Sequence, residues 1–196
     1  MKQQRYTPSL VQNQTYISQI EIWNNDFTKP IETKLSASYT IPIVDIRVDG
    51  NYHLINNPIF YDTLRTSQQF DGAVNIVQLL VRKNLTFGKW HLDNTIALQN
   101  VSEDIIRVPS LYTMNSFYFQ GLIFKRKTLL LKAGFDFRLA SDFFVPAYSE
   151  VIGQFYLQDD LEQRAYPIVD FAMSIKVTRL RAFFRIENIT LSLIHI

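Results

Sequence analysis

The sequence contains no cysteine, which excludes disulfide bonds and thiolate metal sites. Its three histidines, His53, His91 and His195, lie too far apart in the chain for the ligand spacing of a metal motif. We therefore expect neither a metal nor any other cofactor. No apolar run approaches the roughly 18 residues that a membrane-spanning helix requires. This excludes a bundle of membrane helices but not a β-barrel, in which only alternate residues contact lipid.

The chain also lacks a dense block of basic residues, and its 20 Lys and Arg are nearly balanced by 18 Asp and Glu. The tightest basic cluster is Lys125, Arg126 and Lys127. It falls where we expect a tight turn, and the tip of a turn is normally solvated. We therefore expect no nucleic-acid partner.

Motifs for catalysis are missing as well. The sequence contains neither a nucleophile motif nor a phosphate-binding glycine loop. The last long loop contains several carboxylates, Asp159, Asp160 and the nearby Glu150. A pair of such carboxylates can hydrolyse glycosides. Because adjacent residues in a loop usually point apart, we expect no enzyme.

The clearest positive pattern lies in residues 127–141. From Leu129 to Leu139 every second residue is apolar, and the residues between them, except Leu130, are polar or glycine. A period of two indicates an extended strand with one apolar and one polar face. About 11 residues is the length that crosses a bilayer when the strand is tilted, whereas an ordinary strand has about 5–6.

The same pattern recurs along the chain and predicts about nine strands. Pro42 closes the second of them, because proline cannot donate a hydrogen bond to a neighbouring strand. Residues 1–13 are polar, contain Pro8 and are expected to be irregular. The predicted strands occupy residues 14–24, 31–41, 44–52, 73–85, 90–99, 113–124, 129–139, 167–178 and 180–190.

From residue 40 onward, the connections between the predicted strands alternate between short and long. The long ones cover residues 56–72, 102–112 and 142–166. Hairpins with short turns at one end and long loops at the other are typical of outer-membrane barrels, whereas soluble sandwiches use Greek-key connections. The sequence therefore predicts an all-β fold, an antiparallel up-and-down transmembrane β-barrel.

In such a barrel the apolar face contacts lipid and the polar face lines the lumen. A lumen with charges of both signs would hold water and small hydrophilic solutes. The residues that we predict to line it are Lys34, Asp45, Arg47, Asp49, Asp93, Lys132, Asp136, Arg138, Asp170, Lys176, Arg181, Arg185 and Glu187.

Alternation alone does not distinguish the inside of a barrel from its outside. A soluble, lipocalin-like barrel would place the apolar residues inside and bind a small apolar ligand. A third interpretation is an outer-membrane barrel that acts as an enzyme or adhesin through its long loops, 56–72 and 142–166. Strand length and the sorting of the loops favour the membrane channel.

Three segments in the second half of the chain follow one another in a characteristic order. They are RVPSLYTMNSFYFQGLIFKRKTLLLKAGFDFRL, the stretch from PAYSEVIGQFYLQDD to YPIVDF, and RAFFRIEN. In this order, between residues 107 and 188, they resemble the β-barrel porin family of Bacteroidota, while residues 1–106 share only its general pattern. The resemblance implies a passive pore in the outer membrane of a Gram-negative bacterium, with no catalytic residues. The expected partners are membrane lipid and small hydrophilic solutes. Association of several copies into a homo-oligomer is a further possibility that the resemblance leaves open.

Members of that family are longer at both ends, with an export signal first and further strands last. The first ten residues here, MKQQRYTPSL, contain no apolar core of a signal peptide. Outer-membrane barrels typically end in an aromatic residue, whereas this sequence ends in LSLIHI. We therefore expect residues 1–196 to form a single segment of an incomplete barrel, with 191–196 as a tail that is not native.

Overall fold

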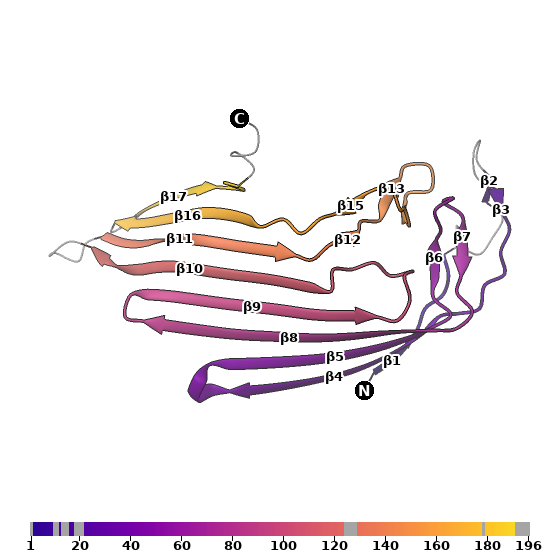
Figure 1. The fold of residues 1–196 in the computed structure, drawn as a ribbon, viewed down its shortest axis with the longest axis horizontal. Helices are drawn as coiled ribbons and strands as arrows, with labels where there is room; N and C mark the ends of the chain where they lie inside the picture. The colour runs from indigo at the N-terminus through magenta and orange to yellow at the C-terminus, as the bar shows by residue number, and fades with distance from the viewer. Residues whose placement is uncertain are drawn as a thin grey trace.

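The computed structural model describes residues 2–9, 12, 16–17, 22–123, 129–177 and 179–190. Its main feature is one nine-stranded sheet in which every neighbouring pair of strands is antiparallel (Figure 1). The strands, in their order across the sheet, are β1 (Lys2–Arg5), β4 (Ile31–Ile41), β5 (Ile46–Asn56), β8 (Ala73–Phe87), β9 (Trp90–Val101), β10 (Leu111–Ile123), β11 (Leu129–Ala140), β16 (Ile168–Val177) and β17 (Leu180–Ile186).

The hairpin of β4 and β5 shows how the sequence sets the strand ends. The predicted strand 31–41 is confirmed as β4, and Pro42 ends it by opening a 3-10 turn, Pro42–Val44. Asp45 closes this turn with a φ of 47°, a left-handed conformation that aspartate tolerates better than most residues. The prediction that Asp45 lies on a strand is therefore wrong, and β5 begins at Ile46.

The hairpin of β8 and β9 has a connection of two residues, Gly88 and Lys89. Gly88 adopts a φ of 64°, which glycine reaches without steric cost. Phe87 and Trp90 lie directly opposite each other across the turn. The tight turn predicted at residues 86–89 is confirmed.

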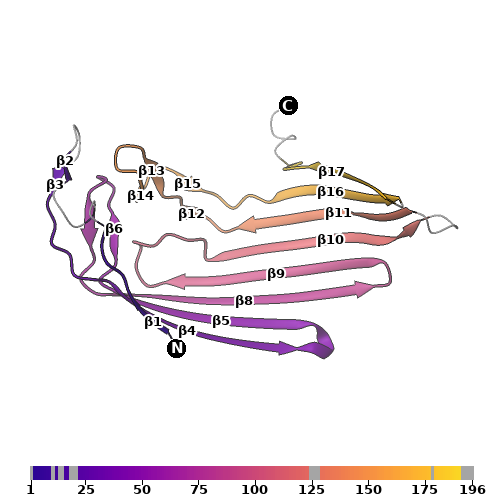
Figure 2. The same cartoon turned by 180° about the vertical axis from the view of Figure 1, so that it is seen from behind.

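Short connections gather at one end of the sheet and long ones at the other (Figure 1). Except for residues 102–110, the long connections contain short paired strands, which Figure 2 shows together at one end. Four such pairs form: β2 (Tyr16–Ile17) with β3 (Ile22–Trp23), β6 (Ile59–Tyr61) with β7 (Ser67–Gln69), β12 (Phe143–Phe144) with β15 (Glu162–Gln163), and β13 (Ala147–Ser149) with β14 (Gln154–Tyr156). The turn predicted for the basic cluster 125–127 and the tail 191–196 lie outside the described residues.

The N-terminal predictions need correction. The range 14–24 does not supply a strand of the large sheet, and its described residues form the short pair β2 and β3. The ninth strand is instead β1, which pairs with β4 through Lys2 opposite Lys34 and Arg5 opposite Ile31. The prediction that residues 1–13 are irregular is therefore wrong for Lys2–Arg5.

The large sheet does not close into a barrel. Its edges are β1 and β17, and these two strands do not pair with each other. Among the described residues, no helix has the length and apolar character needed to cross a membrane.

Among the described residues, three of the four buried apolar residues lie at the long-loop end, and the fourth, Val74, lies on β8. Trp23, Tyr61 and Ile152 form one buried cluster, against which Tyr156 packs. The Trp23 and Tyr61 rings meet edge to face with centroids 6.1 Å apart. Segments far apart in the sequence therefore pack into one body at the long-loop end.

Gly134 on β11 lies tightly against the backbone of β10. A Cβ atom there would lie 2.3 Å from the Phe117 carbonyl oxygen and 2.4 Å from the Tyr118 Cβ. Contacts this short cannot form without moving the backbone. At Gly50 on β5, by contrast, an added Cβ would meet nothing within 4 Å.

We expect Gly134→Ala to destabilise the fold by roughly 1–3 kcal/mol, the range of an overpacked site. Gly50→Ala is the matched control and should change stability little. Urea unfolding of the refolded protein, followed by tryptophan fluorescence, measures both. An equal effect of the two substitutions would contradict the close packing at Gly134.

Candidate functional site

The pairing register gathers the predicted charged residues on one face of the sheet. Residues directly opposite each other on antiparallel strands point to the same side. Asp93 lies opposite Ser116, Ser116 opposite Asp136, and Asp136 opposite Asp170. Continuing this rule across all strands defines a polar face that includes Lys34, Arg47, Asp49, Asp93, Lys132, Asp136, Arg138, Asp170, Lys176, Arg181 and Arg185.

Two of the thirteen predicted residues lie off the strands of this face. Asp45 occupies the turn before β5 and is exposed. Glu187 follows the last residue of β17, and its carboxylate lies 3.3 Å from the Nε of Arg185.

The central strands β8 and β9 show an inverted pattern of exposure. On the apolar face, Val77 is 52% and Leu98 46% exposed. On the polar face of the same strands, Gln78 and Gln99 are half-buried, and the Gln78 amide donates to the Gln99 oxygen over 3.1 Å. A soluble sheet shows the opposite distribution, with its apolar side chains covered.

Asp170 is the most buried charge on the polar face, with no exposed surface. The Nη2 atoms of Arg138 and Arg185 donate to its Oδ2 over 2.6 and 2.9 Å. The backbone N–H of Asn188 donates to Oδ1 over 2.8 Å. Asp170 therefore joins β11, β16 and the end of β17 through three hydrogen bonds from charged or backbone donors.

Asp49 plays a similar part near the other edge of the sheet. It accepts from Ser38 over 2.6 Å and from the Arg47 Nε over 3.0 Å, and the Arg82 Nη1 lies 3.7 Å away. Arg82 is a further residue of the polar face, which we did not predict because 73–85 is apolar on both sides. The strand offers no signal that separates the two faces, because Gln78 and Arg82 share one of them and Asn75 and Lys83 the other.

Tyr118 occupies the middle of the polar face above Gly134, which lies directly opposite it. Its ring stacks on His91, with centroids 4.9 Å apart. The Lys132 ammonium lies 3.9 Å from the Tyr118 ring centroid, a cation–π distance. Beside this row the Ser116 hydroxyl donates to Asp136 over 2.6 Å.

A row of polar residues crosses the apolar face on three neighbouring strands. Lys83, Asn94 and Asn115 lie side by side on β8, β9 and β10. Asn94 donates its side-chain amide to the Lys83 carbonyl oxygen over 3.2 Å, and Asn115 donates to the Thr113 hydroxyl over 2.9 Å. Both asparagines thus satisfy a donor locally despite their apolar surroundings.

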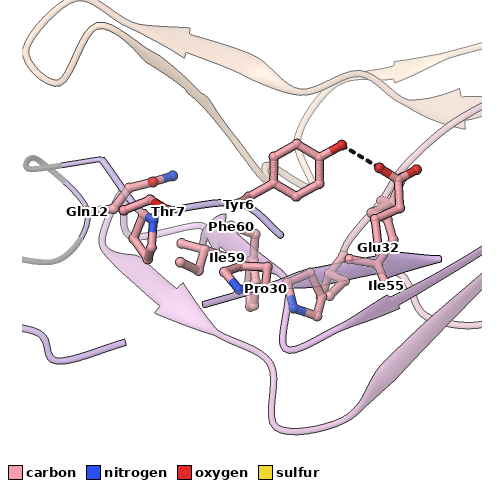
Figure 3. A pocket seen from close by; sticks show the side chains of 12 residues that line it. Tyr6, Thr7, Gln12, Pro30, Glu32, Ile55, Ile59 and Phe60 are labelled. Carbon is pink, nitrogen blue, oxygen red and sulfur yellow. Dashed lines mark hydrogen bonds between the residues drawn. The ribbon is translucent and has the colours of Figure 1, made fainter. Parts of the chain in front are cut away.

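A hollow of about 380 Å³ lies at the long-loop end of the sheet. Figure 3 shows Tyr6 and Glu32 on its wall, joined by a hydrogen bond of 2.5 Å in which the Tyr6 hydroxyl donates. This bond raises the pKa of Tyr6. Glu32 also contacts His53, with the Nδ1 atom 2.7 Å from Oε1. The remaining wall is mainly apolar and includes Pro30, Ile55, Ile59 and Phe60.

Arg107 holds two long loops together. Its Nη1 lies 2.8 Å from Asp159 and its Nη2 2.8 Å from Asp104. Burial lowers the pKa of the guanidinium, but the hydrogen bonds to these carboxylates outweigh it and raise the pKa overall. Since Asp159 is an ion-pair partner of Arg107, the carboxylate that we considered for glycoside hydrolysis has a structural contact here.

The comparison with known families covers almost the whole chain. The family model described as "Putative porin" matches residues 1–194. The chain belongs to this family. The match extends the resemblance from residues 107–188 to the first half, which contributes β1 to β9.

The family assignment agrees with the fold and points to a non-enzyme. A search of curated proteins finds no match. Within the described part of the chain, no group of three or more His, Asp or Glu side chains is placed to hold a metal ion.

We expect Asp170→Asn to lower the free energy of unfolding by about 2 kcal/mol, because two arginines lose their shared carboxylate. Asp136→Asn is the matched control, since an amide oxygen can still accept from Ser116. Urea unfolding in detergent micelles compares them. A loss at position 170 no greater than at 136 would show that Asp170 does not join these strands.

Proposed function

We propose that this protein forms the wall of an outer-membrane channel in a Gram-negative bacterium and passes small hydrophilic solutes passively. The sheet would form part of a transmembrane barrel, with its polar face toward the lumen and its apolar face toward lipid. Association into a homo-oligomer stays a prediction.

The inverted exposure of β8 and β9 carries this proposal. Large apolar side chains such as Val77 and Leu98 are open to the surroundings, while the polar side chains behind them bond to one another. A large exposed apolar surface is costly in water and favourable in lipid. Membership of the porin family supports the same function.

The short-turn end of the apolar face carries aromatic residues of the kind found at membrane interfaces. Trp90 opens β9 beside the short turn and stacks on Phe117 with ring centroids 5.1 Å apart. Phe87 lies opposite Trp90 and is also exposed. These rings would lie at the boundary between lipid and water.

A soluble barrel that binds an apolar ligand requires the apolar face to be the covered one. The exposure of the central strands favours the reverse. An enzyme or adhesin acting through its loops has less support, because the long loops pack on one another through Arg107, Trp23 and Tyr61.

Adjacent residues on β11 provide the test. The chain contains no native cysteine, so Phe135→Cys and Asp136→Cys each place one label on opposite faces. An environment-sensitive fluorophore on the protein in membranes should be blue-shifted and quenched by lipid-borne quenchers at 135. At 136 it should respond to water-soluble quenchers.

The reverse result, with position 135 shielded from lipid quenchers in a soluble particle, would end the channel proposal and favour the soluble barrel. Single-channel recording in planar bilayers is the second readout. Ohmic current is expected from the protein expressed from its complete reading frame, because the sheet of residues 2–190 does not close by itself.

A further inference from the structure

The short-turn end of the polar face carries three cations on neighbouring strands. Lys176 on β16 lies directly opposite Arg181 on β17, and Lys132 on β11 lies opposite Ser174. All three cations are exposed and line one hollow of about 220 Å³, which Ser174 and Phe183 also line.

These cations differ from the arginines elsewhere on the same face. Arg47 and Arg82 share Asp49, and Arg138 and Arg185 share Asp170. Within the described ranges, Lys132, Lys176 and Arg181 have no carboxylate at ion-pair distance. The Lys132 ammonium instead lies over the Tyr118 ring, 3.9 Å from its centroid.

Like charges directly opposite each other on paired strands repel. The pair Lys176 and Arg181 therefore carries an electrostatic cost that the described part of the sheet does not offset. An anion between them would remove the repulsion, and lysine and arginine together suit the oxygens of a carboxylate, sulfate or phosphate.

Phe183 adds an apolar surface to this hollow. It lies on the polar face opposite Ser174 and is 76% exposed. It also borders the neighbouring hollow of about 360 Å³ that Lys132, Asp136 and Arg185 line. A flat ring exposed beside cations can stack on the ring or apolar body of a solute whose acidic group contacts the charges.

We propose that Lys132, Lys176, Arg181 and Phe183 form a binding site for small organic anions, which gives the channel a preference for anions. This inference rests on the proposed function, because it assigns the solute class of the same lumen. In a narrow lumen, fixed positive charges raise the local concentration of anions.

Reversal potentials in a KCl gradient test the preference, using the protein expressed from its complete reading frame in planar bilayers. The wild-type channel should pass chloride more readily than potassium. Lys176→Gln and Arg181→Gln should each lower the chloride-to-potassium permeability ratio about twofold, the size of an exposed ion contact.

Lys34→Gln is the matched control, since Lys34 is an exposed cation on the polar face of β4. It should change the ratio less than either substitution at the short-turn end. Equal shifts for all three, or a wild-type preference for potassium, would overturn the site. A wild-type protein that inserts but does not conduct would instead contradict the proposed function.

The role of Phe183 has its own readout. Benzoate should reduce the chloride current more than acetate does at the same concentration, and Phe183→Ser should abolish this difference. Equal block by benzoate and acetate in the wild-type channel would show that Phe183 does not contact the solute.

Discussion

The two faces of this sheet exist only if every strand pairs with its neighbour in the correct register. Side chains alternate along each strand, and antiparallel pairing transfers this alternation to the next. A slip of one residue in any hairpin would place its charges on the apolar side. The two-residue turn at Gly88 and the 3-10 turn after Pro42 fix the register of two hairpins and hence the continuity of the polar face.

Much of this arrangement was predictable because alternation is a local signal. The strand 31–41, the turn at 86–89 and the polar face of β11 all follow from residues close together in the sequence. Lys2–Arg5 could not be recognised, since KQQR has no apolar alternation and becomes a strand only by pairing with β4. Arg82 and Lys83 show a second limit: in a strand apolar on both sides, composition does not tell which of two adjacent cations joins the charged face.

The long-loop end depends on contacts that no local pattern reveals. Trp23, Tyr61 and Ile152 come from three separate segments, and Arg107 contacts carboxylates in two loops. The sequence pattern predicts a strand of the sheet around Trp23 and irregular loops around Tyr61, Arg107 and Ile152. In the structure, the segments around Trp23, Tyr61 and Ile152 contain short paired strands, and their side chains meet in one buried cluster.

The two edges of the sheet have a directional relationship. Since each of the nine strands runs opposite to its neighbour, the first and the ninth, β1 and β17, run the same way. If these edges met directly, the junction would be a parallel ladder with slanted hydrogen bonds, unlike every other pair in the sheet. To close the sheet with antiparallel pairs alone, an odd number of further strands would have to lie between β1 and β17. The nine strands therefore determine whether the number of added strands is odd or even.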